Sequence, residues 1–314
     1  MVATPQPGSN EGRLDVDGTP QTVGGALERV FAALEGAELF YGHGTDNPWD
    51  EAVQLVLCAC RYPVDAGEAV LSDKLDAMHW KRIVNWVSLR VEQRLPLPYI
   101  TGEAWFAGLR FHCDRRALVP RSPLAELILR DFAPWWTGPN PPSSLLDLCC
   151  GGGAIGIAAA VMNPELQLSL ADIDADALSL AGENVAAYKL QSRASLFRSD
   201  LFTDIPQQQF DIILSNPPYV DAGDMASMPE EYRSEPQLGL ASGQDGLVHT
   251  RAILCAAADY LTDQGLLFVE VGNSWLALDR LLERYPLTWL EFESGGHGVF
   301  VLRREELPAV IALL

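Results

Sequence analysis

The apolar residues in the first hundred positions recur every three to four residues. Residues 23–40 show this period at five positions: Ala26, Leu27, Val30, Ala33 and Leu34. The stretches WDEAVQLVLCACRY and HWKRIVNWVSLRVEQRL continue it, which is typical of amphipathic helices. We therefore predict a helical domain over residues 21–95. It is preceded by a flexible tail over residues 1–20, which are rich in Pro, Gly and Ser.

The pattern changes over residues 96–120, where aromatic and β-branched residues lie between glycines. This predicts a β-hairpin that links two domains. From residue 121 to 314, short apolar runs alternate with helical stretches; the runs are SSLLDL, LQLSLAD, FDIILS and GLLFVEV. The alternation predicts an α/β fold with a doubly wound, mostly parallel sheet. The ending LTWLEFESGGHGVFVLRR predicts two antiparallel strands at the sheet edge.

The charge of the chain limits its partners. With 22 Lys and Arg against 42 Asp and Glu, the formal net charge is -20. Such a chain repels a phosphate backbone, so we expect neither direct DNA binding nor binding to an anionic membrane. A basic protein is an electrostatically favourable partner.

The cysteines and the N-terminus bear on the compartment. None of the six cysteines forms a CxxC pair, and no His/Cys cluster has the spacing of a zinc site. The first residues lack the basic and apolar regions of a signal peptide, and no uncharged apolar run reaches the ~18 residues of a membrane span. We therefore predict a cytoplasmic protein with reduced thiols and no catalytic metal.

A glycine-rich loop follows the predicted strand SSLLDL. Gly151, Gly153 and Gly156 satisfy the GxGxxG pattern of nucleotide-binding loops, in which the backbone turns sharply and approaches a ligand. The next strand ends at Asp172, nineteen residues after Gly153, where a carboxylate can accept hydrogen bonds from ribose hydroxyls. A tight strand-to-helix turn with an incidental acid would give the same pattern.

Two ligands fit this loop, a nicotinamide dinucleotide and S-adenosylmethionine. Asp147, just before the loop, favours the second, because a carboxylate there repels a pyrophosphate and faces a cationic sulfonium ligand. Asp200 follows the third strand and is placed to reach the adenine amino group, with Leu201 and Phe202 offering apolar surface to the ring. Asp200 could equally cap the following turn.

Residues 215–220, SNPPYV, close the fourth strand with two consecutive prolines. Neither proline can donate a backbone hydrogen bond, and Pro217 restricts Asn216 to extended conformations. Alone, the motif also fits a rigid turn. Together with the glycine loop, NPPY resembles the amino-group-directed class of S-adenosylmethionine methyltransferases, which have the class I Rossmann-like fold.

The flanking segments narrow the resemblance. They are RLPLPYITGEAWFAGLRFHCDRRALVPRSPLAELI, SNPPYVDAGDMASMPEEYRSEPQLGLASGQDGL and FVEVGNS. Together they resemble the HemK-like protein glutamine-N5 methyltransferases over roughly residues 22–305. Within that family, VPRSPLAEL is similar to the PrmB branch, which modifies a large-subunit ribosomal protein, L-three. The resemblance implies that the helical domain selects the substrate.

The resemblance also implies a site. The Asn216 side chain and the Pro217 carbonyl each accept one N–H of a glutamine amide, Pro218 stiffens the loop, and Tyr219 packs on the amide. The implied cofactor is S-adenosylmethionine, with S-adenosylhomocysteine as product. Its expected contacts are Asp147, Cys149, Cys150, Gly151, Gly152, Gly153, Asp172, Asp200, Leu201 and Asn216.

Several alternatives stay open at this point. Cys149 replaces the first glycine of the usual loop, and Arg121 is either a substrate-binding residue or a partner in an interdomain salt bridge. The substrate is either the free ribosomal protein or an assembly intermediate. Competing functions are glutamine methylation of release factors, DNA adenine-N6 methylation, a nicotinamide-dependent oxidoreductase, and a non-catalytic assembly factor.

Overall fold

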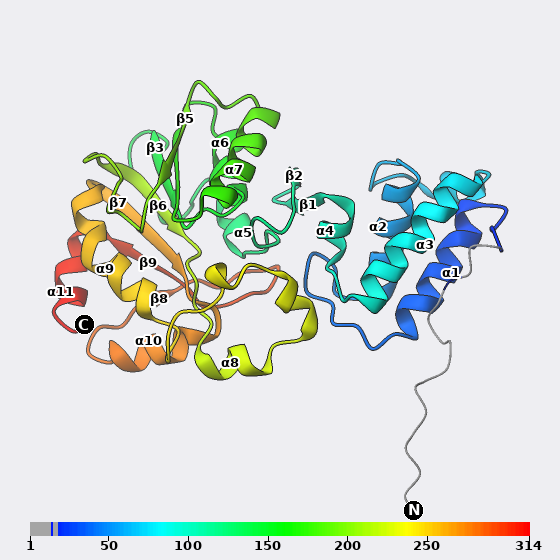
Figure 1. Cartoon of the computed structure of the whole chain (residues 1–314). Coiled ribbons are helices and arrows are strands. Elements are labelled where there is room, and N and C mark those ends of the chain that lie inside the picture. Colours follow the sequence, from blue (N-terminus) through cyan, green and yellow to red (C-terminus); the bar gives the residue numbers. More distant parts are fainter. Residues whose placement is uncertain (1–13, 15–17) are drawn as a thin grey trace, which may run out of the picture. The chain divides into compact units, whose positions relative to one another are not determined.

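The computed structural model describes residues 14 and 18–314 (Figure 1). Most of the predicted tail, residues 1–20, lies outside the described residues. The chain divides into two compact units. The first runs to Gly102 and includes Pro229–Ser234, and the second comprises Glu103–Met228 and Glu235–Leu314. The division between the units falls inside the predicted linker, residues 96–120.

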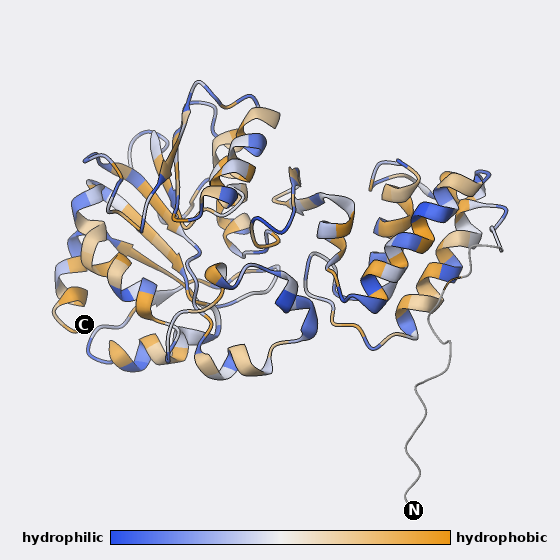
Figure 2. Cartoon of the chain, viewed as in Figure 1, coloured by the Kyte–Doolittle hydropathy of each residue, from blue (hydrophilic) through white to orange (hydrophobic). Residues whose placement is uncertain are grey.

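The first unit is helical. It contains α1 (Val23–Glu35), α2 (Pro48–Ala59), α3 (Ala77–Glu92), α4 (Leu97–Thr101) and the 3-10 turn η1 (Glu68–Ser72). Side chains at the N-caps of the first three helices, Thr22, Asn47 and Asp76, accept hydrogen bonds from backbone N–H groups. Figure 2 shows apolar residues along these helices, and their buried faces form one hydrophobic cluster. The apolar period therefore predicted these helices correctly.

A short segment from the far part of the sequence packs with the helical unit. It is η2 (Glu230–Ser234), and its Glu231 is only 2% exposed. The Glu231 carboxylate accepts from the Phe40 backbone N–H at 3.0 Å and from Arg90 Nη1 at 3.3 Å. Arg90, itself buried, also donates to Glu51 at 2.5 Å. This buried ionic cluster was not predicted, because a lone acidic residue in a polar loop has no distinctive pattern.

The second unit is built on a seven-stranded sheet of order β5-β4-β3-β6-β7-β9-β8. The strands are β3 (Ser144–Leu148), β4 (Gln167–Asp172), β5 (Ala194–Arg198), β6 (Phe210–Ser215), β7 (Leu261–Glu270), β8 (Thr288–Trp289) and β9 (Val299–Arg303). The first five are parallel, and β8 and β9 add antiparallel pairs at one edge. The predicted α/β fold with a mostly parallel sheet is confirmed.

Both faces of this sheet are covered, because successive strand residues enter different cores. Leu145 belongs to one hydrophobic cluster and Leu146 to the other. The helices α5 (Leu124–Leu129), α6 (Ala154–Met162) and α7 (Ala175–Ala187) contribute to the first cluster. The helices α9 (Val248–Tyr260), α10 (Trp275–Leu281) and α11 (Leu307–Ile311) contribute to the second. The remaining elements are α8 (Ala222–Ser227) and the turns η3 (Gln237–Gly239), η4 (Gly272–Ser274) and η5 (Arg304–Glu306).

The hairpin predicted within residues 96–120 consists of β1 (Glu103–Phe106) and β2 (Leu109–His112), paired antiparallel. Its Phe106 and Phe111 are buried in the same cluster as α5 and α6. The hairpin therefore belongs to the second unit, because its apolar face completes that core. Among the described residues, no helix is both long and apolar enough to cross a membrane.

Candidate active site

The carboxyl ends of β3, β4, β5 and β6 meet at one edge of the sheet, because these strands are parallel. The strand order reverses between β3 and β6, and ligands of open α/β sheets bind in the crevice at such a point. The glycine-rich loop follows β3 and the NPPY segment follows β6. The two strand ends are joined directly, since Ser215 Oγ donates to the Leu148 carbonyl at 2.8 Å.

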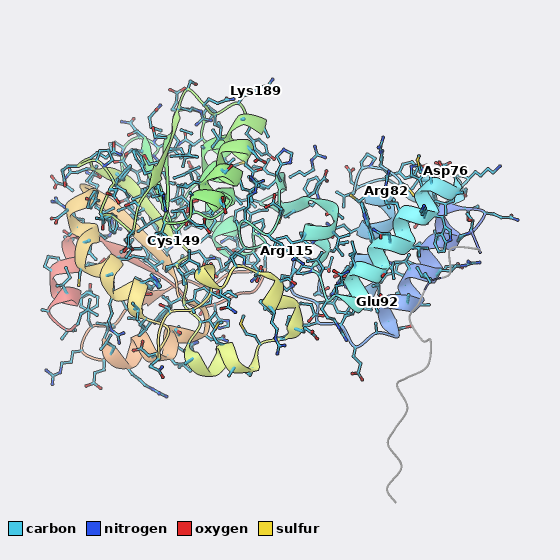
Figure 3. All side chains as sticks on the ribbon, in the orientation of Figure 1. Asp76, Arg82, Glu92, Arg115, Cys149 and Lys189 are labelled. Carbon is cyan, nitrogen blue, oxygen red and sulfur yellow. The ribbon has the colours of Figure 1, made fainter. Side chains whose placement is uncertain are left out.

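The loop after β3 adopts left-handed backbone at three positions. Cys149 has φ 61°, Gly151 φ 54° and Gly153 φ 79°. Cys149, marked in Figure 3, therefore has the conformation that glycine favours, as its place in the usual loop pattern suggests. Burial raises the pKa of both the Cys149 and the Cys150 thiols, so neither is a reactive thiolate.

The third glycine of the pattern serves packing. A Cβ on Gly156 would lie 2.8 Å from side-chain atoms of Asp147, Leu168 and Leu170. The Gly156 N–H donates to Asp147 Oδ2 at 2.8 Å, so this carboxylate holds the first turn of α6. Asp147 Oδ1 is buried and has no hydrogen-bond partner among the described residues. Burial raises the pKa of Asp147 to about 7. Its role toward a cofactor stays a prediction.

Asp172, at the end of β4, holds the glycine loop in place. Its two carboxylate oxygens accept from the backbone N–H groups of Gly151 at 2.8 Å and Asp174 at 2.9 Å. Burial raises its pKa. Each oxygen keeps a second lone pair, so Asp172 retains the capacity to accept from ribose hydroxyls.

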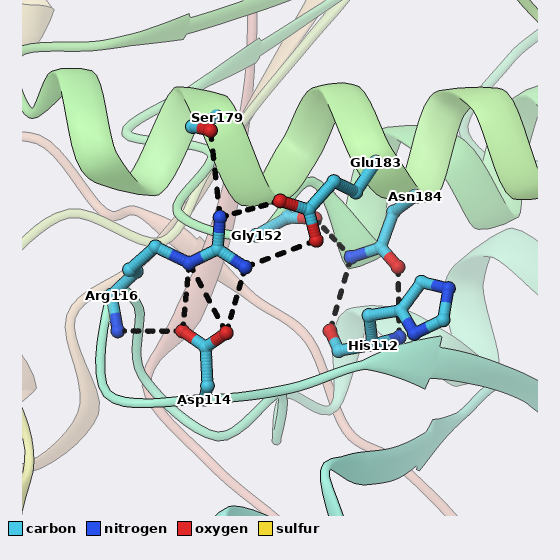
Figure 4. A network of polar contacts seen from close by, with 7 residues as sticks. All are labelled: His112, Asp114, Arg116, Gly152, Ser179, Glu183 and Asn184. Carbon is cyan, nitrogen blue, oxygen red and sulfur yellow. Dashed lines mark hydrogen bonds and ion pairs between the residues drawn. The ribbon is translucent and has the colours of Figure 1, made fainter.

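Asn184 on α7 holds the other side of the loop and was missed from the sequence. Its Nδ2 donates to the Gly152 carbonyl at 2.9 Å and to the His112 carbonyl at 3.2 Å, while its Oδ1 accepts from the His112 N–H at 2.8 Å (Figure 4). Arg116 bridges Asp114 and Glu183 in the same network. A single amide in a helix has no sequence signal that would reveal such a role.

The segment after β5 carries the predicted adenine contacts. Asp200 is exposed, and Leu201 is half-buried with φ 49°. The charge of Asp200 acts on the Cys149 thiol and on the His249 imidazole, which places it near both the loop and NPPY. Phe202 does not offer a free surface. It is 5% exposed and stacks on Tyr260 with ring centroids 4.6 Å apart, so that part of the expectation is wrong.

Three acidic side chains lie close enough to the loop to act on the Cys149 thiol: Asp172, Asp147 and Asp200. Acidic side chains are compatible with a cationic sulfonium ligand and unfavourable for a pyrophosphate. Among the described residues, no group of three or more His, Cys, Asp or Glu side chains could hold a metal ion.

The NPPY segment presents two acceptors. Asn216 is half-buried, and Pro217 and Pro218 are buried. Neither the Asn216 side chain nor the Pro217 carbonyl has a hydrogen bond to another described residue. The Pro218 carbonyl is different, because it accepts from the His249 imidazole, a residue to which the sequence alone assigned no role.

Tyr219 is held by the segment that follows β7. Its hydroxyl donates to Glu270 Oε1 at 3.2 Å, and its carbonyl accepts from Ser274 Oγ at 2.8 Å. A Cβ on Gly272 would lie 2.4 Å from the Tyr219 ring. All three residues lie in the segment FVEVGNS, which resembles the glutamine methyltransferases. That resemblance was the only sequence signal for them, and it did not reveal their contacts with Tyr219.

Arg121 forms an ion pair inside the second unit. Its two terminal nitrogens donate to the two carboxylate oxygens of Glu235, at 2.7 and 2.6 Å. Glu235 is buried and also accepts from the Val119 N–H at 3.0 Å. Glu235 belongs to the same unit as Arg121, so this ion pair lies within the second unit. The role of Arg121 toward substrate stays a prediction.

The chain is similar to known methyltransferases. The methyltransferase small domain family matches residues 137–230. A ribosomal protein uL3 glutamine methyltransferase from Francisella tularensis is 40% identical over 95% of this chain and 95% of its own length. One of the same name from Bordetella pertussis is 40% identical over 91% of this chain and 96% of its own length. A solved 16S rRNA N2 G1207 methyltransferase from T. thermophilus is far more distant, at 20% identity and a TM-score of 0.44, covering 64% of this chain and 49% of that one.

Proposed function

Because the chain belongs to the ribosomal protein uL3 glutamine methyltransferase family, we propose that it methylates the side-chain nitrogen of a glutamine in that ribosomal protein. The observation that carries the proposal is the 40% identity over 95% of both chains. The two unpartnered acceptors at the end of β6 supply the chemistry. Glutamine methylation of release factors and adenine methylation of DNA are the alternatives that the experiment below separates.

A carboxamide nitrogen is a poor nucleophile, because its lone pair is delocalised into the carbonyl. The Asn216 side-chain oxygen and the Pro217 carbonyl each accept one N–H of the substrate amide. With both hydrogens fixed, the remaining direction of the nitrogen points toward the methyl donor. Stabilising the nitrogen in this orientation is an electrostatic and positional effect of the chain's own dipoles.

The backbone around these acceptors is rigid for identifiable reasons. Two prolines restrict the segment, Ser215 ties its start to β3, and His249 holds the Pro218 carbonyl. The Pro217 carbonyl therefore has a fixed orientation as a hydrogen-bond acceptor. After transfer, a protonated N-methyl amide is strongly acidic and sheds its proton to solvent, so no strong general base is required.

The cofactor of this reaction is S-adenosylmethionine, which supplies an electrophilic methyl group on a sulfonium and leaves as S-adenosylhomocysteine. The residues that would hold it are those of the loop after β3, with the carboxylates of Asp147, Asp172 and Asp200 around it. Asp172 would accept from the ribose hydroxyls, Asp200 would accept from the adenine amino group, and Leu201 would offer the ring an apolar surface. The negative field at Cys149 favours the cationic cofactor over its neutral-sulfur product.

The net charge of -20 suits a basic ribosomal protein as substrate. We assign substrate selection to the helical unit, and to Arg121 a place at the substrate side of the site. All six cysteines are free thiols, which fits a protein that acts in the cytoplasm, where ribosomal proteins are made. The substrate is either the free ribosomal protein or an early assembly intermediate.

The test is a competition for label. The purified protein is incubated with radiolabelled S-adenosylmethionine, unmethylated uL3, unmethylated release factors and duplex DNA, each alone and then in a mixture. The proposal expects label in uL3, on a glutamine located by tandem mass spectrometry. Comparing free uL3 with isolated assembly intermediates then identifies the better substrate. Label confined to release factors or to DNA contradicts the proposal.

A further inference from the structure

We propose that Glu270 is a positioning residue of the NPPY segment, whose carboxyl holds the Tyr219 hydroxyl and so fixes the acceptors that orient the substrate amide. The proposal deepens the proposed function and rests on it only for the reaction that this positioning serves.

Glu270 lies where it can act on NPPY because of the strand register. β6 and β7 run parallel, and Ser215 is paired with Val269. Glu270 is the next residue along β7, as Asn216 is the next residue after β6. Its side chain is buried, with the residue 5% exposed. A carboxyl at this depth is costly unless hydroxyl or N–H donors satisfy its oxygens.

Both oxygens of the carboxyl have a donor. Oε1 accepts from the Tyr219 hydroxyl at 3.2 Å and Oε2 from Ser122 Oγ at 2.5 Å. Glu270 has no ion pair among the described residues. The cation that acts on it is Arg121, which is itself paired with Glu235. The carboxyl is therefore held in place by two hydroxyls and connects the start of α5 to NPPY.

Two residues close to Glu270 in the sequence also contact Tyr219. Gly272, with φ 44°, provides a surface without a side chain, since a Cβ there would overlap the ring. Ser274 Oγ donates to the Tyr219 carbonyl at 2.8 Å. Hydroxyl, ring and backbone of Tyr219 are thus each fixed by one residue of a five-residue segment.

The fixed position of Tyr219 also restricts the Pro217 carbonyl, because only Pro218 separates the two residues. Proline restricts φ at both positions, so fixing Tyr219 leaves little freedom for the carbonyl between β6 and the ring. Releasing the Tyr219 hydroxyl would let the downstream end of NPPY move. Substrate orientation would suffer, while the loop after β3 would keep its own contacts.

Protonation affects this arrangement in a defined direction. Burial raises the pKa of Glu270 to about 7, partly offset by the hydrogen bonds from Ser122 and Tyr219 and by the charge of Arg121. An ionised carboxyl accepts from both hydroxyls. A protonated one must donate, so one hydroxyl has to turn away. The positioning is therefore complete only above the pKa.

The kinetic test uses Glu270→Met, which removes both acceptor oxygens, and Tyr219→Phe, singly and together. Ser122→Ala is the matched control that removes the other hydroxyl. We expect each of the first two to lower kcat about tenfold or more, with the affinity for S-adenosylmethionine within about twofold of wild type. The double variant should lose no more than the worse single one, because both break the same hydrogen bond. Ser122→Ala should cost less. Additive losses, or equal losses in all three, overturn the proposal.

Two further readouts do not depend on the substrate being correct. Hydrogen exchange followed by mass spectrometry should show faster exchange at Tyr219 and Val220 in Glu270→Met, with residues 149–156 unchanged. Unchanged exchange at Tyr219 would refute the positioning role even if the enzyme methylates a different protein. In wild type, kcat should rise with pH through about 7, and Glu270→Gln should abolish this inflection. An inflection that survives the substitution contradicts the proposal.

Discussion

The Gly156 N–H lies 2.8 Å from Asp147 Oδ2, so a buried carboxylate in β3 binds the first turn of α6. This contact fixes the end of the glycine-rich loop against β3. It also buries a charge that has one oxygen without a partner among the described residues. Asp147 therefore stabilises the geometry of the loop while its ionised form is costly.

Asp147→Asn should remove part of the pH dependence of stability. The pKa of Asp147 is raised from 3.8 to about 7, so its contribution is fully present below pH 3.8 and is lost as pH rises through 7. The asparagine side chain cannot ionise, so the variant should not show this loss of stability between pH 3.8 and pH 7. Its free energy of unfolding relative to wild type should rise by about 4 kcal/mol between pH 4 and pH 8. Denaturant titrations of both proteins across this pH range measure the change. Because Glu270 titrates in both proteins, the quantity to compare is the difference between their free energies of unfolding. Parallel stability curves would refute the assignment.

Gly156→Ala should destabilise the second unit. The added Cβ would meet side-chain atoms of Asp147, Leu168 and Leu170 at 2.8 Å, which forces α6 away from the sheet. We expect a loss of about 2 kcal/mol in the free energy of unfolding. The control is Gly182→Ala in α7, where the nearest atom is 3.7 Å away. That change should stabilise the helix by about 0.5–1 kcal/mol, so equal effects of the two substitutions would contradict the packing role.

Asp172→Ala should weaken cofactor binding and also loosen the loop. It removes the acceptor for the Gly151 and Asp174 N–H groups as well as the proposed ribose contact. We expect at least about tenfold weaker binding of S-adenosylhomocysteine by calorimetry and a loss of about 1–3 kcal/mol in stability. Asp174→Ala, which removes only the N-cap of α7, is the control for stability alone. An unchanged affinity in Asp172→Ala would remove Asp172 from the cofactor site.

Glu231→Ala should destabilise the helical unit. It leaves Arg90, 1% exposed, with one carboxylate fewer, and it removes the acceptor of the Phe40 N–H. Removing one partner of a buried ionic cluster costs about 3–5 kcal/mol. Thermal unfolding followed by circular dichroism measures the loss, with Glu230→Ala, an exposed neighbour, as control. A wild-type transition in Glu231→Ala would show that the cluster contributes little.

The apolar patterns were sufficient to predict the parallel sheet, its antiparallel edge and the helices, because period and length are local properties. The residues of the loop and of NPPY were also identifiable, since glycines and paired prolines have few other uses at strand ends. The pattern did not predict that Phe106 and Phe111 pack into the second unit, or that Phe202 belongs to a core. Partner choice among buried aromatics depends on tertiary packing that no period encodes.

The sequence did not predict the residues that hold the loop and NPPY in place through hydrogen bonds. Asn184, His249 and Glu270 act through hydrogen bonds to the backbone or to a neighbouring side chain, and each is far in sequence from the residue it holds. Polar residues of this kind look like ordinary helix or strand residues until the fold brings them together. The Arg121–Glu235 pair was missed for the same reason, since its partners are 114 residues apart.

The central claim, that Asn216 orients the substrate amide, is tested most directly by single-turnover methyl transfer to uL3. Wild type is compared with Asn216→Ala and with Asn216→Asp, which keeps an acceptor oxygen, and the affinity for S-adenosylmethionine is measured on the same samples. The account predicts a loss of about 100-fold or more in the transfer rate for Asn216→Ala, with affinity within about twofold and partial activity in Asn216→Asp. A parallel loss of transfer and affinity in Asn216→Ala, or transfer at the wild-type rate, would contradict it.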